Sequence, residues 1–145
     1  MDKTKELLEA VNVYFDAIYF CDAEKIDRVF HEASSLFDAD SGMIFVDPIA
    51  SFRADVDARP APAERSQTRS DEIIAIDWLS ELSAVVKLRL QSHENVFVDH
   101  LSFVKGATGW KIVAKVWHLE RTAEVVEIRS KERADQVISS FTGCR

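Results

Sequence analysis

The chain is 145 residues long, with 47% hydrophobic and 30% charged residues and a formal net charge of -7. This length suits one domain with a single core, and the composition excludes a disordered chain. The acidic balance argues against nucleic acid as a partner, because such binding relies on clustered Lys and Arg. The start lacks a signal-peptide layout and no apolar run approaches the roughly 18 residues of a membrane span, so we expect a cytoplasmic protein without a membrane partner.

Two helices are predicted at the start of the chain. Between Lys3 and Phe20, apolar residues recur at spacings of three and four, which places one stripe along a helix. Tyr14 and Tyr19 belong to this stripe. Asp22 is a typical N-cap for a second, shorter helix. His31 is expected to end that helix, where a cation is favoured by the carbonyl end of the helix dipole.

Short strands and a third helix are predicted next. Residues 35–38 and 43–47 read as two strands around a polar turn, and Pro48 can begin a helix that carries Phe52 and Val56 inward. Residues 59–66 contain two prolines and no period, so we expect a loop there.

Four strands dominate the second half of the chain. Residues 71–78, 82–90, 96–105 and 110–119 are rich in β-branched and aromatic residues and are separated by short polar turns, which predicts an antiparallel meander. Residues 134–141 return to helical spacing. We therefore expect a domain over residues 1–119 and a C-terminal extension, residues 120–145, that packs on the same domain or on a dimer partner.

The last hairpin predicts which side chains face the helices. A connection at residues 106–109 would pair Phe103 with Ile112 and Asp99 with Val116. Strand side chains alternate, so this register places one apolar set on the inner face. The set is Phe97, Asp99, Leu101, Phe103, Trp110, Ile112, Ala114, Val116 and His118. Its ionisable members, Asp99 and His118, would lie diagonally across the pair, within reach of a hydrogen bond or a shared ligand.

The opposite face of this hairpin mixes apolar and polar side chains. Its larger apolar members are Val98, Val104, Val113 and Trp117. A monomer would expose them as one patch, so we expect a homodimer that buries the outer face of the sheet.

The chain resembles the putative lumazine-binding family of nuclear-transport-factor-2-like proteins over about residues 7–118. The resemblance rests on the order of elements and on four short sequences, which are Tyr14-Phe15, Phe30-His31, Asp99-His100-Leu101 and the stretch from Gly109 to His118. It implies an α+β fold in which a cone-like, curved antiparallel sheet wraps three N-terminal helices around a pocket. It also implies pairing of such sheets in dimers.

The pocket would take a small apolar or aromatic molecule, since apolar walls interrupted by few polar groups are typical of ligand sites. The candidate ligand-binding residues are Tyr14, Tyr19, His31, Asp99, Trp110 and His118. Each also has a structural interpretation, as core packing, a helix cap or, for Asp99 and His118, mutual pairing. No cofactor is expected. No metal site is expected either, because the four His are scattered without a ligand spacing.

Three functions remain open from the sequence. The first is binding of a small molecule whose identity the sequence does not give. The second is proton-transfer catalysis of the isomerase, dehydratase or cyclase kind that similar folds carry out, with Asp99 as the base and His118 and Tyr14 as hydrogen-bond donors. The third is a non-catalytic dimeric interaction module with a filled core.

Overall fold

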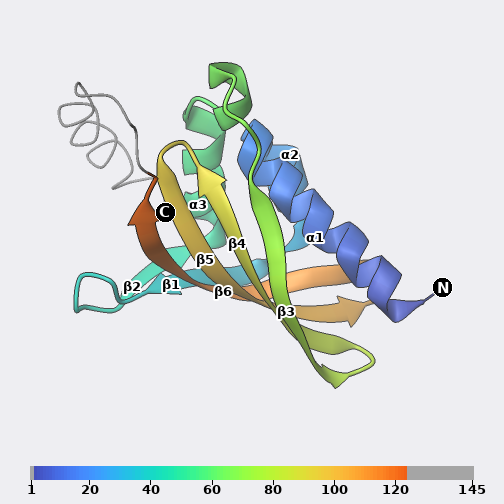
Figure 1. Ribbon diagram of the computed structural model, residues 1–145. Coiled ribbons are helices and arrows are strands. Elements are labelled where there is room, and N and C mark those ends of the chain that lie inside the picture. The colour runs from blue at the N-terminus through green and yellow to red at the C-terminus, as the bar shows by residue number, and fades with distance from the viewer. Residues whose placement is uncertain (1, 124–145) are drawn as a thin grey trace, which may run out of the picture.

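The computed structural model describes residues 2–123, which form three helices and a six-stranded sheet (Figure 1). The helices are α1 (Lys3–Phe20), α2 (Ala23–Val29) and α3 (Ile49–Ala58), followed by the 3₁₀ turn η1 (Pro62–Arg65). The strands are β1 (Phe30–Asp38), β2 (Phe45–Pro48), β3 (Asp71–Ser80), β4 (Ser83–Ser92), β5 (Asn95–Gly106) and β6 (Gly109–Thr122). The helix predicted over residues 134–141 and most of the C-terminal extension lie outside the described residues.

Local capping explains where the first two helices begin and end. The Asp2 side chain accepts a hydrogen bond from the backbone N–H of Thr4 and starts α1, and Cys21 ends α1 in a left-handed conformation with φ of 48°. Asp22 then caps α2 by accepting from the backbone N–H groups of Glu24 and Lys25. The predicted bounds of the first helix and the predicted Asp22 cap are confirmed.

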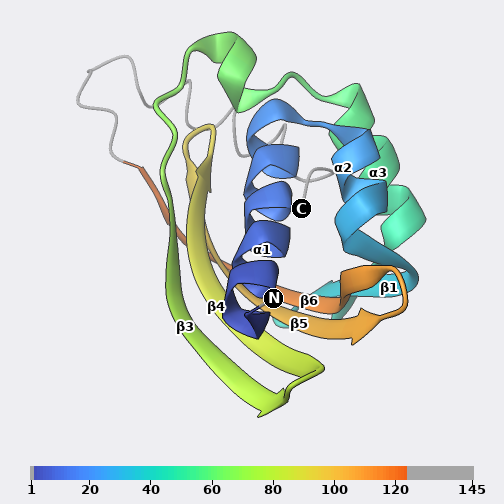
Figure 2. The ribbon, with the colours of Figure 1, turned by 90° about the vertical axis from the view of Figure 1, so that its right-hand side faces the viewer.

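The strand order is β2-β1-β6-β5-β4-β3, and every neighbouring pair is antiparallel except β1 with β6, which is parallel. The sheet is strongly curved, and α1 lies in its concave side with α2 and α3 beside it (Figure 2). The predicted α+β fold, with a curved sheet wrapping three N-terminal helices, is confirmed. Within residues 2–123, none of the helices is both long and apolar enough to cross a membrane.

The second helix ends earlier than the sequence suggests. Phe30 already has extended backbone angles and pairs with Ile112 of β6, so β1 begins five residues before the predicted Ser35. His31 therefore lies in a strand and not at a helix end. The parallel partner of this strand is about eighty positions away in the sequence, which is why local periodicity misses it.

A bulge in β6 changes the predicted register. Phe103 pairs with Ile112 as expected, but Ser102 then pairs with Ala114, so Val113 is an extra residue in β6. Asp99 consequently lies opposite Trp117 and not Val116. From the bulge onward the predicted faces of β6 are exchanged, because one extra residue moves every following side chain to the other side of the sheet.

The exchange is visible in burial. Lys115 and Trp117 are each 5% exposed, whereas Val116 is 52% exposed and His118 is also exposed. The prediction that Val116 and His118 face the helices is wrong, as is the assignment of Trp117 to the outer face.

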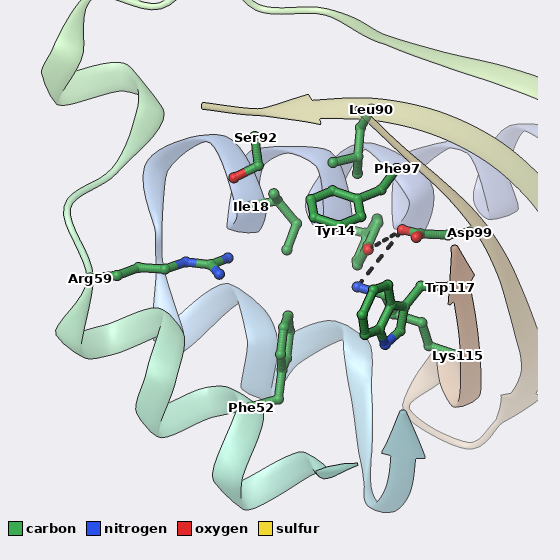
Figure 3. A pocket seen from close by; sticks show the side chains of 10 residues that line it. All are labelled: Tyr14, Ile18, Phe52, Arg59, Leu90, Ser92, Phe97, Asp99, Lys115 and Trp117. Carbon is green, nitrogen blue, oxygen red and sulfur yellow. Dashed lines mark hydrogen bonds and ion pairs between the residues drawn. The ribbon is translucent and has the colours of Figure 1, made fainter. Parts of the chain in front are cut away.

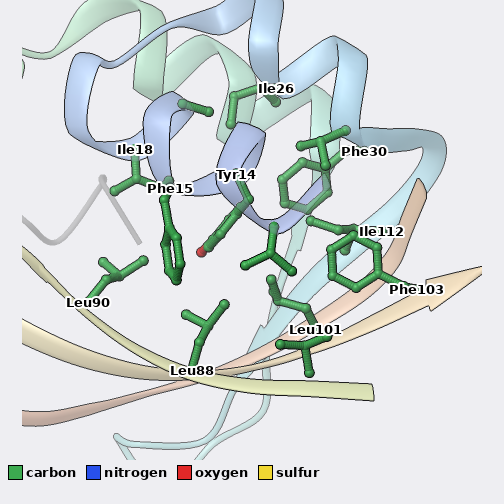
Figure 4. Packing of buried hydrophobic residues seen from close by; sticks show 14 of the residues in the cluster. Tyr14, Phe15, Ile18, Ile26, Phe30, Leu88, Leu90, Leu101, Phe103 and Ile112 are labelled. Atoms are coloured by element: carbon green, nitrogen blue, oxygen red, sulfur yellow. The ribbon is translucent and has the colours of Figure 1, made fainter. Parts of the chain in front are cut away.

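The core fills the space between α1 and the concave face of the sheet (Figure 4). Three residues of the neighbouring strands β4, β5 and β6 are fully buried in this core, namely Leu88, Leu101 and Ile112. Tyr14 of α1 packs edge-on against Phe30, with ring centroids 6.0 Å apart. Burial of this apolar surface is the main source of stability, and the same packing places the Tyr14 hydroxyl beside the polar side chains described below.

Candidate functional site

Two charged side chains lie inside this core. Asp99 of β5 is 1% exposed and Lys115 of β6 is 5% exposed. Asp99 faces the helices in either register, and the bulge in β6 brings Lys115 to the same concave face, where Lys115 Nζ lies 3.8 Å from Asp99 Oδ2. Taking a charge out of water is costly unless it is paired, so the two groups stabilise each other in place.

Tyr14 completes the cluster from the opposite side. Its hydroxyl donates a hydrogen bond to Asp99 Oδ2 at 2.5 Å (Figure 3). Burial, together with the negative charge of Asp99, raises the pKa of Tyr14 well above its usual value. Tyr14 is therefore a protonated donor throughout the neutral range.

Lys115 is surrounded mainly by aromatic rings. Its Nζ lies 4.8 Å from the centroid of the Phe52 ring and 5.3 Å from that of Tyr14, which are cation–π distances. Burial lowers the pKa of Lys115, although the charge of Asp99 opposes this shift. The cluster thus combines a carboxylate, a phenol and an amine in a site of low polarity.

The cluster forms one wall of a pocket. The lining residues are Tyr14, Ile18, Phe52, Arg59, Leu90, Ser92, Phe97, Asp99, Lys115 and Trp117 (Figure 3). The free volume inside is about 20 Å³, which is room for about one water molecule. Including its mouth, which is open to solvent, the hollow measures about 320 Å³. A larger ligand would therefore place one edge inside and the rest in the mouth.

Arg59 lies on the side of the pocket nearest the end of α3. It is the residue that caps α3, and its guanidinium is 6.0 Å from the Phe52 ring and donates to Cys21 Sγ through Nε. Figure 3 shows this side chain pointing toward the pocket from the opposite side to Asp99. With Lys115 and Asp99, it gives the pocket two positive groups and one negative group.

Within residues 2–123, Asp99 Oδ1 and Ser92 Oγ are buried polar atoms of the lining that have no hydrogen-bond partner. A buried carboxylate oxygen without a donor costs free energy, and such atoms in a folded protein usually meet water or a ligand. Asp99 Oδ1 is thus an acceptor in the pocket wall that the described residues leave without a donor.

Of the residues predicted for the site, the structure brings Tyr14 and Asp99 together. His118 is not with them, because the bulge in β6 turns it to the outer face. There its Nδ1 lies 2.6 Å from Asp40 Oδ1. The predicted pairing of Asp99 with His118 is wrong, and Lys115 is the residue that pairs with Asp99 instead.

The other three predicted ligand-binding residues lie outside the pocket lining. The Tyr19 hydroxyl donates to the backbone carbonyl of Gln67 and so anchors the segment after η1. His31 is exposed on β1, where its Nδ1 accepts from the backbone N–H of Ala33. Trp110 is buried and packs edge-on against another tryptophan of the sheet.

Sequence reasoning missed Lys115, Arg59 and Ser92. An unbroken register would put Lys115 on the outer face, together with Trp117, and so hides it from sequence reasoning. The signal against that register was Trp117, since it put a large aromatic side chain on the solvent side and a histidine in the core.

Two other hollows are larger but weaker candidates. One is lined around Glu6 and Lys105, whose side chains already pair at 2.6 Å. The other extends from α2 to Lys111, whose Nζ donates to the carbonyl of Arg28. Across the described part of the chain, no three His, Cys, Asp or Glu side chains gather in a way that could hold a metal ion.

Solved structures share this fold. The chain is similar to a nuclear-transport-factor-2-like protein of unknown function from Silicibacter pomeroyi DSS-3, at 20% identity and a TM-score of 0.72, over 83% of this chain and 100% of that one. It is similar to another from Methylobacillus flagellatus KT, at 24% identity and a TM-score of 0.71, over 83% and 94% of the two chains. At these identities the likeness establishes the fold alone.

No curated protein matches this chain. The family model described as putative lumazine-binding matches residues 2–118, a range that holds the helices, the sheet and the Tyr14, Asp99 and Lys115 cluster. The chain therefore belongs to the putative lumazine-binding family, and it shares the fold of nuclear-transport-factor-2-like proteins.

Proposed function

We propose that this protein binds a small, largely apolar cyclic molecule that donates an N–H or O–H group to Asp99. The observation that carries the proposal is Asp99 Oδ1, a buried acceptor that has no donor among residues 2–123 and belongs to a hollow with otherwise mostly apolar walls. A ligand donor would remove the cost of leaving that oxygen unpaired, so its hydrogen bond would add both affinity and orientation.

The walls favour a planar ring. Phe97 and Trp117 pack edge-to-face with centroids 5.7 Å apart, and both line the pocket. At the other side, Arg59 offers a cation to a carbonyl or a negatively charged edge. Lumazine, the compound in the family description, carries ring N–H groups next to carbonyl groups and so has the required donors and acceptors. Because the free volume is small, such a ring would lie partly in the mouth.

Proton-transfer catalysis is the second candidate function of the same pocket. It is favoured by the Tyr14 hydroxyl held on Asp99 and by the amine of Lys115 beside it, which together form a chain of groups that exchange protons. Relative to the sequence-based hypothesis, Lys115 takes the place of His118 as the second group beside Asp99. The third function, a dimeric interaction module with a filled core, is favoured by the small free volume.

Matched ligands test the binding proposal. Ligand-observed NMR would measure the affinity of lumazine and benzimidazole, and of their N-methylated forms, which keep the ring but lack the donor. We expect the N-methylated compounds to bind about tenfold more weakly or worse, since a hydrogen bond to a charged acceptor contributes about 1.5–3 kcal/mol.

The variants separate the site from the rest of the surface. Asp99→Asn should weaken the binding of the N–H compounds, whereas Asp77→Asn, at an exposed position on β3, should leave their affinity unchanged. Equal affinity of N–H and N-methyl compounds, or an equal effect of the two variants, would contradict the proposal.

A further inference from the structure

We propose that Lys115 is an amine nucleophile and that the pocket takes aldehydes or ketones, which form an imine with Lys115 Nζ. This inference rests on the proposed function, because it requires the pocket to admit a small molecule. It assigns to that pocket a reactive atom and a chemical class of substrate.

The geometry singles out this lysine. Its side chain lines the pocket, and its Nζ lies over the Tyr14 and Phe52 rings and 3.8 Å from Asp99 Oδ2. By contrast, Lys105 donates to Glu6 at 2.6 Å and Lys111 donates to the carbonyl of Arg28. Lys115 thus combines burial with access from the pocket, and its ion pair with Asp99 is longer than the contacts of the other two lysines.

The protonation state of the amine decides whether it can attack a carbonyl. The pKa of Lys115 depends on burial and on three charged side chains, Asp99 of β5, Asp47 of β2 and Arg59 at the end of α3. Burial is the largest and lowers the pKa of Lys115, and Arg59 lowers it further, while Asp99 and Asp47 raise it; the net shift is downward. A larger neutral fraction than that of an exposed lysine follows, which is the usual way a buried lysine is activated.

Tyr14 and Asp99 can carry the protons of the reaction. The neutral amine adds to the carbonyl carbon, forming a C–N bond, and the carbonyl oxygen takes the Tyr14 proton. Asp99 accepts a proton from the nitrogen and passes it to the Tyr14 oxygen, which restores the Tyr14 hydroxyl. A second transfer by the same route lets the oxygen leave as water while the C=N bond forms. The balance is one carbonyl compound and one amine giving one imine and one water, with no oxidant or reductant.

Reductive trapping tests the proposal on the full chain. The protein would be treated with propanal and a low concentration of sodium cyanoborohydride at pH 7, which reduces an imine to a stable secondary amine, and peptide mass spectrometry would follow each lysine over time. Lys87, exposed on the outer face of β4, is the matched control. We expect Lys115 to be labelled at least tenfold faster than Lys87, and benzimidazole to slow Lys115 alone.

The outcomes separate the two proposals. Labelling of Lys115 no faster than that of Lys87, while benzimidazole still binds, would overturn the imine and leave the binding function in place. If benzimidazole also fails to bind, both fall. A Lys115→Met chain should lose the fast label and keep the slow ones; a fast label that persists at another lysine would contradict the assignment of the reactive amine.

Discussion

At the scale of single residues, the unusual feature is a carboxylate and an ammonium group placed within an apolar core. Asp99 and Lys115 lie on neighbouring strands and are almost fully buried. Each makes the burial of the other tolerable, so neither position can be understood from its own strand.

A double-mutant cycle measures this dependence. Asp99→Asn should destabilise the protein by about 3 kcal/mol, since it leaves the Lys115 charge buried without its closest counter-charge. In a Lys115→Met background the same change should cost less than about 1 kcal/mol, because no buried cation remains. Urea unfolding of the four proteins gives the coupling. Equal losses in both backgrounds would show that the two side chains act independently.

His93 provides a second residue-level prediction, for pH. Its backbone has φ of 55°, and its Nε2 lies 3.0 Å from the carbonyl oxygen of Pro60. Burial lowers the pKa of His93 below its usual 6.5, although the Pro60 carbonyl opposes this shift. The folded state therefore holds the proton less well than the unfolded state. The free energy of unfolding therefore has its full value above about pH 6.5 and decreases as the pH falls through the lower folded pKa.

Urea unfolding at pH 7 and pH 5 tests this dependence. The wild-type chain should lose more stability between the two pH values than His93→Asn, a replacement that tolerates the left-handed backbone. The same loss in both proteins would assign the pH dependence to other groups.

At the scale of elements, the bulge in β6 is the decisive feature. It lets Phe103 and Ile112 pair as in a regular hairpin and then shifts the strand, so that Lys115 and Trp117 enter the core. Without it, Asp99 would face Val116 and the site would have no amine.

Paired truncations test the bulge. Trp117→Ala should cost about 3–5 kcal/mol because it empties a buried aromatic site, whereas Val116→Ala should cost less than about 1 kcal/mol at an exposed position. Ile112→Ala, before the bulge and fully buried, should cost about 2–5 kcal/mol in either register and serves as the reference. Chemical denaturation measures the free energy of unfolding of the three variants. A larger loss of stability for Val116→Ala than for Trp117→Ala would support the register without the bulge.

The sequence predicts elements better than it predicts their pairing. The bounds of α1 and the Asp22 cap follow from interactions a few residues apart, so periodicity and capping rules find them. The start of β1 and the bulge depend on strands that are distant in sequence or on a single extra residue, which leave little local signal. The same division applies to the site. Tyr14 and Asp99 stand out as polar residues on apolar stripes, whereas Lys115 appears only once the bulge is known.

At the scale of the whole molecule, the outer face of the sheet remains to be accounted for. Val85, Val104 and Val116 are 37%, 39% and 52% exposed on neighbouring strands, and the register places their side chains on one face. We propose that a second copy of the chain covers this face. Because of the bulge, Val116 is on the outer face of β6, where Trp117 was expected.

Light scattering tests the dimer. At tens of micromolar the wild-type chain should have the mass of two chains, and Val104→Asp should shift it to one, because a charge would be buried at the centre of the face. Ala54→Asp, which adds the same charge at an exposed position of α3 on the helical side of the sheet, serves as the control. A clean monomer mass for the wild-type chain would contradict the proposed interface.

The proposed binding of a small molecule in the Asp99 pocket can be observed directly. A crystal structure of the protein grown with benzimidazole at saturating concentration would show where the compound lies and which group it donates to Asp99. We expect the ring to lie against the Phe97 and Trp117 side chains, with its N–H group about 3 Å from Asp99 Oδ1. A pocket that stays empty at saturation, or a compound bound elsewhere or with its N–H group directed into solvent, would contradict the proposed binding.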